Sequence, residues 1–362
     1  SLNISSSFAL PRFAVANGAS CIACHVNPTG SGLRNSHGND VVSLEELPLK
    51  RWIDKGDENW DGYITENLQI GGDFRIQGIQ YNDSESTRKS AFFPMQADIY
   101  TNIKLNENAS IFTKVGVKGA GTINLEYWAF ISNLPKKAWI RVGRTLPNYS
   151  IRVDDHTSFI RGGNLGKTSV GLDKEGLLFK PSLSPPAILE LGVPISAHLE
   201  WTASLSTSLV NAANQEMNNF TSKFTHRGSL SEDINYRAGI SYMHEDNFNM
   251  VGASGGISYG NFTWTFEADQ AENWIDGTTS LALYDELAWE IVQGIQLIGK
   301  YDFFDPNTDL ADGAISRYTL GAEIYPLNIM EIKLQVRFNK IEPDNTVQEK
   351  DPEYLIQTHF FF

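Results

Sequence analysis

From about residue 67 to its last residue, the chain alternates apolar and polar side chains with a period of two. In segment 261–269, Phe262 and Trp264 fall on one face of an extended strand, while Thr263 and Glu267 fall on the other. The same alternation recurs in segments 97–105, 234–242, 318–325 and 330–339. Such strands, about 9 to about 13 residues long, can cross a bilayer at a tilt. The pattern therefore predicts an all-β fold built from membrane-spanning strands.

Counting these segments gives about sixteen antiparallel strands. We expect them at 67–81, 92–105, 109–119, 122–132, 136–144, 168–180, 197–209, 220–230, 233–243, 247–258, 261–272, 278–291, 294–303, 315–325, 329–340 and 352–362. An even number of strands places both chain ends on the periplasmic side of an outer membrane. Segment 181–196 is the weak point, because its four prolines should break any strand and leave a long connection where a short turn is expected.

A soluble β-sandwich or lipocalin-like barrel would also alternate, but two features argue against it. About sixteen strands exceed what one sandwich normally holds. The connections also alternate in length, with short turns such as 260–261 and 293–294 and longer polar loops such as 145–167 and 304–314. Short turns on one side and long loops on the other are typical of a transmembrane outer-membrane β-barrel.

The end of the chain, Thr358-His359-Phe360-Phe361-Phe362, carries aromatic side chains stepping back from the last residue at every second position. This ending resembles the C-terminal aromatic signature of bacterial outer-membrane barrels. We therefore expect a protein of the bacterial outer membrane, in contact with its lipid. A mature protein of this kind has lost its export signal, and we expect that the signal was removed ahead of Ser1.

Composition narrows the range of partners. The formal net charge is -14, which argues against nucleic acid, because phosphate contacts need clustered Lys and Arg; metal ions and other cations fit better. No window approaches 18 consecutive apolar residues, which argues against a transmembrane helix. Residues 1–66 are rich in Gly, Ser, Asn and Pro and lack clean alternation. We therefore divide the chain into a leader, 1–66, and a barrel, 67–362.

The leader contains the pentapeptide Cys21-Ile22-Ala23-Cys24-His25, which has the C-x-x-C-H spacing of a c-type haem attachment site. Two thiols about one turn apart can form thioethers with one porphyrin, and the adjacent imidazole can ligate its iron. A thioredoxin-like redox pair, a zinc site and a local disulfide are the alternatives. The chain has only two cysteines and no βαβ pattern around them, so haem c is the favoured interpretation.

His25 is the expected proximal ligand of the iron. The leader has no methionine and only one other histidine, His37, so we expect His37 as the distal ligand. A ligand supplied by the barrel, or an open or water-bound position, remains as an alternative. By the alternation of their strands, Met95 and Met330 should meet lipid, whereas Met243 follows the polar face and could reach the lumen.

A calcium site is a second candidate in the leader. Oxygen ligands occupy the first, third and fifth positions of a calcium loop at Asp57, Asn59 and Asp61. The twelfth position, which should be a bidentate Glu, is Leu68, leaving Glu66 as a misplaced substitute. An Asx-rich turn before the first strand explains the same residues equally well.

Two alternatives are open for the loop 145–167. In a wide barrel an early long loop of this kind can fold inward and narrow the channel. It can also remain a solvated extracellular loop. The candidate residues for a pore constriction are Arg152, Asp154, Asp155, His156 and Arg161.

The order of the leader motifs resembles that of a known family. Ahead of the barrel come the run Phe8-Ala9-Leu10-Pro11-Arg12-Phe13-Ala14, then Gly18, then the pentapeptide Cys21 to His25. This order looks like that of the fused outer-membrane cytochrome-porins with which iron-oxidising bacteria carry out extracellular electron transfer. The resemblance implies that Cys21 and Cys24 hold one haem and that His25 ligates it. The continuation Val26 to Gly32 departs from that group, which puts the substrate in doubt more than the architecture.

The leading hypothesis is electron transfer across the outer membrane. Electrons would pass between an extracellular metal ion, mineral or cytochrome and a periplasmic cytochrome. The alternative is a diffusion porin whose haem-bearing leader is a structural plug or a docking module. A haem enzyme such as a peroxidase is a third class, and it would need an open position on the iron.

Overall fold

The computed structural model describes residues 11–30, 32–49, 60–82, 87–118, 122–152, 157–163, 176–177, 185–210, 214–341, 348–349 and 351–362. Within these residues two strands are short, β1 (Tyr63–Thr65) and β17 (Gln348–Glu349). The other sixteen are β2 (Leu68–Asn82), β3 (Arg88–Asn106), β4 (Ala109–Lys118), β5 (Thr122–Leu134), β6 (Ala138–Arg144), β7 (Ala187–Pro194), β8 (Leu199–Ser206), β9 (Asn219–Ser231), β10 (Ile234–Glu245), β11 (Phe248–Tyr259), β12 (Phe262–Glu272), β13 (Thr279–Val292), β14 (Ile295–Asp305), β15 (Ile315–Leu327), β16 (Met330–Ile341) and β18 (Glu353–Phe361).

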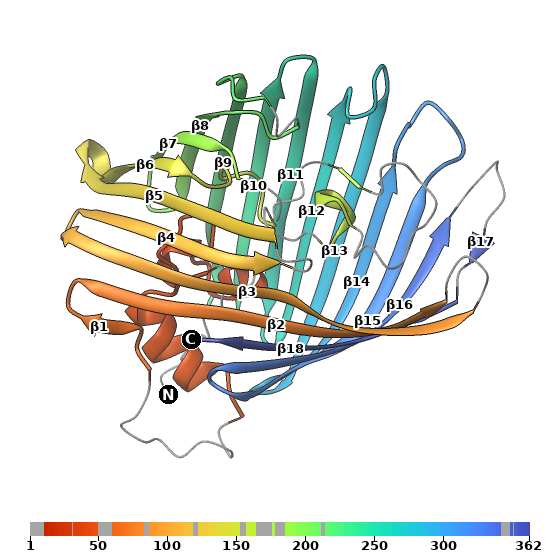
Figure 1. The fold of residues 1–362 in the computed structure, drawn as a ribbon, viewed down its shortest axis with the longest axis horizontal. Coiled ribbons are helices and arrows are strands. Elements are labelled where there is room, and N and C mark those ends of the chain that lie inside the picture. Colours follow the sequence, from red (N-terminus) through yellow and green to blue (C-terminus); the bar gives the residue numbers. More distant parts are fainter. Residues whose placement is uncertain are drawn as a thin grey trace.

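These sixteen strands form one closed antiparallel barrel (Figure 1). Each long strand pairs with the next along the chain, and β18 returns to pair with β2, from Tyr354 opposite Gln80 to Phe361 opposite Asp73. Closure leaves no long sheet edge, which is the condition for a β-structure to sit in lipid. The predicted all-β barrel of about sixteen antiparallel strands is therefore confirmed.

The two faces of the barrel wall are reversed relative to a soluble protein. On β12 and β13, the cross-strand partners Trp264 and Leu287 lie on the outer face and are 41% and 51% exposed. The next partners, Thr265 and Glu286, point inward and are 0% and 1% exposed. An apolar outer belt around a polar interior is the arrangement of a barrel surrounded by lipid. The belt agrees with the predicted location in an outer membrane.

One predicted strand is wrong. The position beside β6 is occupied by β7, at Ala187–Pro194, and not by the predicted segment 168–180. The prolines mark the ends of this strand: Pro185 and Pro186 directly precede it and Pro194 is its last residue. The long connection is therefore 145–186, on the long-loop side, and the turn 195–198 on the other side is short. This removes the irregularity expected at 181–196.

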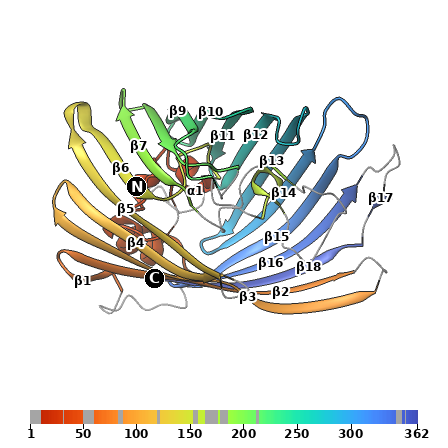
Figure 2. The ribbon, with the colours of Figure 1, turned by 45° about the horizontal axis from the view of Figure 1, so that its top comes forward.

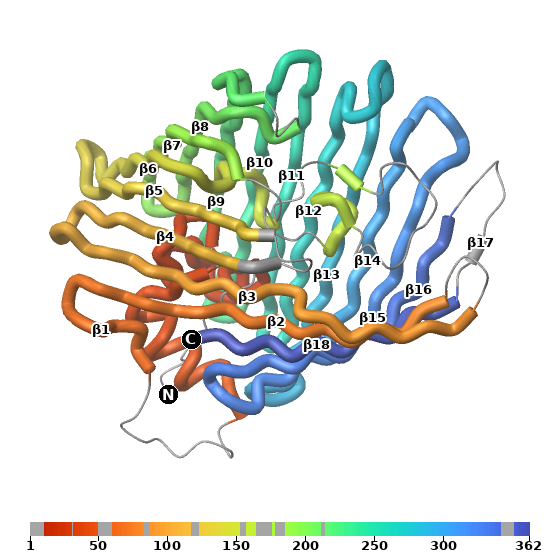
Figure 3. Tube along the Cα trace, in the orientation of Figure 1, coloured from red at the N-terminus to blue at the C-terminus, as the bar shows by residue number. Residues whose placement is uncertain are grey.

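The described N-terminal residues, 11–30 and 32–49, lie inside the ring of strands and at its short-turn end (Figures 2 and 3). We call residues 11–30 and 32–49 the plug. It contains α1 (Pro11–Ala16), the short turn η1 (Cys21–Ala23) and the helix η2 (His37–Glu46). Helix α1 contacts β10, β11 and β12. In the described part of the chain, no helix has the length and hydropathy needed to cross a bilayer.

A second segment also enters the lumen. We call residues 145–152 and 157–163, which include the turn η5 (Phe159–Arg161), the inward loop. Its side chains Tyr149, Phe159 and Ile160 are at most 2% exposed and belong to a cluster with Met243 and Met250 of β10 and β11. The expectation that Met243 faces the lumen is therefore confirmed. The plug and the inward loop therefore both pack against the inner face of the wall.

The outward orientation of Leu320 on β15 supports a direct test. Leu320 is 60% exposed at the middle of its strand, where the wall should meet the bilayer centre. We expect Leu320→Arg to lower the free energy of unfolding in lipid vesicles by about 2 to about 4 kcal/mol, because the guanidinium must enter hydrocarbon. Leu310→Arg, in the loop 306–314, is the matched control and should leave the free energy unchanged. An equal effect of the two substitutions would contradict the assigned outer face.

Candidate functional site

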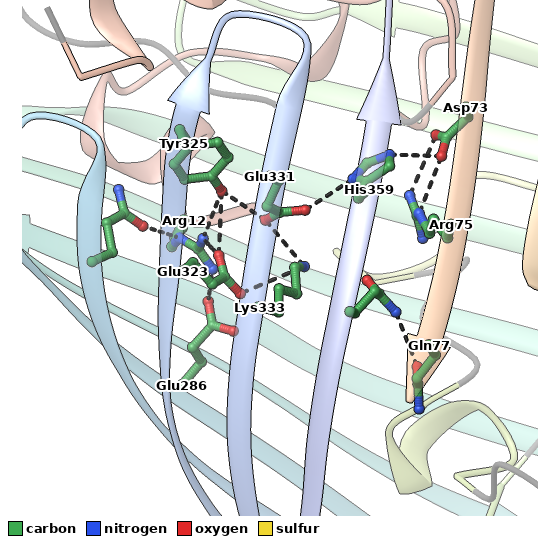
Figure 4. A network of polar contacts seen from close by, with 12 residues as sticks. Arg12, Asp73, Arg75, Gln77, Glu286, Glu323, Tyr325, Glu331, Lys333 and His359 are labelled. Atoms are coloured by element: carbon green, nitrogen blue, oxygen red, sulfur yellow. Dashed lines mark hydrogen bonds and ion pairs between the residues drawn. The ribbon is translucent and has the colours of Figure 1, made fainter. Parts of the chain in front are cut away.

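Arg12 anchors the plug to the barrel wall (Figure 4). Its guanidinium donates to Glu286 of β13 at 3.0 Å and to Gln296 of β14 at 2.9 Å, and it also pairs with Glu323 of β15. The side chains of Arg12, Glu286 and Glu323 are only 1–2% exposed. Burial alone would lower the pKa of Arg12, but Glu323 and Glu286 outweigh it and hold that pKa well above its ordinary value. The plug is therefore attached through a charged arginine in a buried site.

The polar network continues around the wall toward the barrel seam (Figure 4). The Tyr325 hydroxyl donates to Glu331 at 2.9 Å, and Lys333 pairs with Glu331 at 3.3 Å. His359 on β18 then joins Glu331, at 2.9 Å from its Nδ1, to Asp73 on β2, at 2.7 Å from its Nε2. One continuous set of side-chain contacts thus links the plug to β13, β15, β16, β18 and β2.

The C-x-x-C-H pentapeptide forms a compact turn. The backbone N–H groups of Cys24 and His25 both donate to the Cys21 carbonyl, at 3.2 Å and 3.0 Å. This turn sets the two thiols about one helical turn apart, as thioether attachment to one porphyrin requires. Neither cysteine is part of a disulfide; Cys21 is partly exposed, whereas Cys24 and His25 are buried.

Glycine at position 38 allows the plug to close around the pentapeptide. The Asn35 N–H donates to the Cys24 carbonyl at 3.0 Å, and helix η2 begins directly afterwards. A Cβ added at Gly38 would collide with that same Cys24 carbonyl and would lie 2.9 Å from the Cβ of Arg34. The close approach of helix η2 to the pentapeptide therefore needs a residue without a side chain.

Cys21, Cys24 and His25 line one cavity of about 240 Å³ inside the barrel. The plug, the inward loop and the strands β2, β3, β9, β10, β13–β16 and β18 all contribute to its lining. Apolar side chains on it include Phe13, Val42, Leu47, Leu355 and Phe361. A porphyrin needs such an apolar surface beside its two anchoring thiols and its imidazole ligand. The donor set and the surroundings fit a haem c.

The charge of the cavity also fits this group. Its described lining residues include nine Lys and Arg against four Asp and Glu, in a chain whose net charge is -14. Arg34 lies with its guanidinium carbon 4.2 Å from the centre of the Phe361 ring. Burial lowers the pKa of Arg34 to about 10, which Asp73 only partly opposes, so the group stays cationic at neutral pH. Excess buried positive charge suits the two carboxylates of a haem.

The predicted distal ligand lies elsewhere. His37 is exposed at the first residue of helix η2 and is absent from the described residues that line the cavity. His25, by contrast, lines the cavity and forms an antiparallel bridge with Arg34. The structure therefore does not bring His25 and His37 together on this cavity, and the ligation of iron by either residue stays a prediction.

Met95 was expected to face lipid, and this expectation is wrong. Arg75 of β2 lies opposite Gln96 of β3, but the next residue, Ile76, lies opposite Pro94. Met95 is therefore the extra residue of a β-bulge, which interrupts the period of two and lets Met95 line the cavity. The sequence carried a signal, because a proline within a strand is often found at a bulge.

The calcium prediction falls partly outside the described residues, since these do not include Asp57 and Asn59. Asp61 accepts from the Tyr63 N–H at 2.8 Å through its side chain, as in an Asx turn. Glu66 is exposed in the turn between β1 and β2. Among the described residues, no three His, Cys, Asp or Glu side chains gather where they could hold a metal ion. Calcium binding stays a prediction.

Of the five residues predicted to form a pore constriction, the structure describes two, Arg152 and Arg161. Asp154, Asp155 and His156 lie outside the described residues. Arg161 of the inward loop pairs with Asp269 at 2.8 Å and with Glu267, both on β12. Arg152 pairs with Glu286 of β13 at 2.9 Å. Buried ion pairs thus hold the inward loop against the wall of the lumen, and its role as a pore constriction stays a prediction.

No family model and no curated protein matches the sequence of this chain. Its structure is similar to an anion-selective porin from Comamonas acidovorans, with a TM-score of 0.56, 10% identity and coverage of 82% of this chain and 99% of the porin. It is also similar to Salmonella typhi OmpF in complex with daunomycin, with a TM-score of 0.56, 12% identity and coverage of 83% and 99%. The outer membrane channel DcaP of Acinetobacter baumannii gives a TM-score of 0.56 at 9% identity, covering 83% and 99%. The chain therefore has the fold of a bacterial outer-membrane porin.

Removal of the Arg12 anchor should loosen the plug. Arg12→Gln removes one cation from Glu286 and Glu323, which keep Lys300 and Lys333 as partners, so the loss should cost at most about 3 kcal/mol. We expect the ionic conductance of single barrels in planar bilayers to rise, and the plug to become sensitive to added protease. Arg88→Gln, at an exposed arginine on β3, is the control and should change neither. Conductance and protease resistance that stay at the wild-type level in Arg12→Gln would refute the anchoring role.

Proposed function

We propose that this porin-type barrel carries one covalent haem c in its plug and transfers single electrons across the outer membrane. Cys21 and Cys24 would form the thioethers and His25 would ligate the iron. The observation that carries the proposal is the position of these three residues, which line one cavity inside the lumen. A haem held by these residues would lie inside the lumen and not in a separate cytochrome domain outside the barrel.

The surroundings of the cavity would serve such a haem in three ways. Phe13, Val42 and Leu47 would shield it from water and lower the local dielectric. Arg34 would compensate the charge of a haem carboxylate. The buried contacts of Arg12 would hold the plug, and with it the haem, at a fixed place in the wall. A bound haem c supplies reversible exchange of one electron at its iron.

The position of the plug in the barrel suggests which redox partner would meet the haem at each end. Gln293, in the short turn between β13 and β14, donates to the backbone carbonyls of Glu45 and Pro48 in the plug, at 2.7 Å and 3.0 Å. The short turns of an outer-membrane barrel face the periplasm. A periplasmic cytochrome would therefore exchange electrons at this end. At the long-loop end, the proposed partner is an extracellular metal ion, mineral or cytochrome.

A diffusion porin with a structural haem-bearing plug is the second candidate. The similarity to porins of known structure favours it, because that fold commonly forms an aqueous channel. The two candidates share the haem and the barrel, and they differ in what crosses the lumen. Measurement of ion flow and electron flow on the same preparation separates them.

Haem attachment can be tested before either flow is measured. We expect the purified protein to retain haem after denaturation, with the absorption spectrum of a haem c. Cys24→Ala should abolish this retention, because one of the two thioether donors is missing. Ile22→Ala, within the same pentapeptide, leaves both thiols and the imidazole in place and should retain the haem. Absence of covalent haem in the wild-type protein from a host that matures c-type cytochromes would refute the proposal.

Electron transfer can be tested in liposomes that enclose an oxidised soluble cytochrome c. We expect an external reductant that does not cross lipid to reduce the enclosed cytochrome when wild-type protein is present, and far more slowly with Cys24→Ala. Ionic conductance of the wild-type protein should stay low in planar bilayers, because the plug and the inward loop both occupy the lumen. High conductance together with electron transfer no faster than that of Cys24→Ala would support the diffusion porin instead.

A further inference from the structure

The cavity beside the pentapeptide contains one methionine. Met95 lines it together with Cys21, Cys24 and His25, although the pentapeptide belongs to the plug and Met95 to the barrel wall. The β-bulge at Met95 is what puts this thioether on the inner side. A flexible, polarisable thioether is a known type of ligand of haem iron.

The other methionines do not share this position. Met243 and Met250 are fully buried in the cluster around Tyr149, and Met217 is 54% exposed. Neither these three nor Met330 is among the described residues that line the cavity. Met95 is therefore the only methionine placed there within the described part of the chain.

A histidine on the same cavity is less available. His359 also lines it, but both of its ring nitrogens contact carboxylates, Asp73 at 2.7 Å and Glu331 at 2.9 Å. Ligation of iron by His359 would break one of these buried contacts at the seam between β18 and β2. Ligation by Met95 would break no ion pair.

The sulfur of Met95 is held in place by neutral groups. Gln357 of β18 points its side-chain amide at the Met95 Sδ, 3.0 Å away, and the same amide donates to Gln77 of β2 at 3.0 Å. A thioether sulfur is a weak hydrogen-bond acceptor, so this contact costs little to give up. The wall therefore presents a positioned sulfur ligand that makes only a weak contact.

From these contacts we infer that the Met95 Sδ is the distal ligand of the haem iron, opposite His25. The inference rests on the proposed haem and deepens it by naming the second ligand. It assigns this ligand to the barrel, whereas the sequence favoured His37 of the plug. Ligation across the two parts would tie the plug to β3 whenever the iron–sulfur bond is made. It would also give a higher reduction potential than two histidines.

The test compares absorption and near-infrared magnetic circular dichroism spectra of purified holoprotein in detergent. In the ferric wild-type protein we expect a low-spin haem with the charge-transfer band of iron bound to a thioether. Met95→Leu keeps the side-chain volume but lacks the sulfur, so this band should be lost and the reduction potential should fall. Met95→His should restore a low-spin spectrum, with the band position of two histidines. Met330→Leu and His37→Ala are the controls and should retain the wild-type spectrum.

The outcomes separate this inference from the proposed function. If haem is attached covalently but Met95→Leu keeps the thioether band, or if the wild-type protein lacks that band, then Met95 is not the ligand and the haem proposal stands. If the wild-type protein carries no covalent haem, the proposed function fails and this inference fails with it. Heat-modifiable migration on gels shows that each variant is a folded barrel. A Met95→Leu variant that misfolds leaves the decision to the wild-type spectrum and to Met95→His.

Discussion

Closure of the sheet between β18 and β2 is the constraint on which the rest of the structure depends. A strand surrounded by lipid must hydrogen-bond all of its backbone groups, and only a closed ring achieves this. The seam is reinforced from inside, where His359 of β18 joins Asp73 of β2 to Glu331 of β16. Closure also decides which side chains go where, because alternate residues must face either lipid or the lumen. The apolar residues take the lipid side, and a charged interior is the consequence.

That charged interior determines how a plug can bind. The plug has little apolar material of its own, and its buried residues Phe13, Val42 and Leu47 pack against Tyr325 and Phe361 of the wall. Its polar contacts follow the same logic. Arg12 meets two glutamates that the wall already buries, each of which also pairs with a lysine of the wall, Lys300 or Lys333. The plug therefore completes both an apolar cluster and an ion-pair network that the barrel begins.

Local patterns in the sequence predicted much of this architecture, and long-range contacts and backbone irregularities account for what they missed. Alternation predicted fifteen of the sixteen long strands and most of their faces, because the pleat obliges neighbouring residues to face opposite sides. The alternation failed to predict β7, because the prolines there lie at the ends of the strand and do not interrupt it. It also failed at Met95, because one extra residue in β3 reverses which side chains face inward. The C-x-x-C-H spacing predicted that Cys21, Cys24 and His25 act together, since they are neighbours in the chain, and all three do line one cavity. Arg12 and Glu323 are 311 residues apart, and no local pattern could pair them.

The position of the cavity bears on the choice between the two candidate functions. It lies between two fillers of the lumen, with Cys24 and His25 lining it from the plug and Asn148 and Arg152 from the inward loop. Buried ion pairs fix both fillers, through Arg12 in the plug and Arg161 in the inward loop. A diffusing solute would have to pass both of them through continuous water. An electron needs no water path, and it benefits from a cofactor that is shielded and rigidly held. These two fixed segments support our proposal of electron transfer, whereas the porin fold supports diffusion.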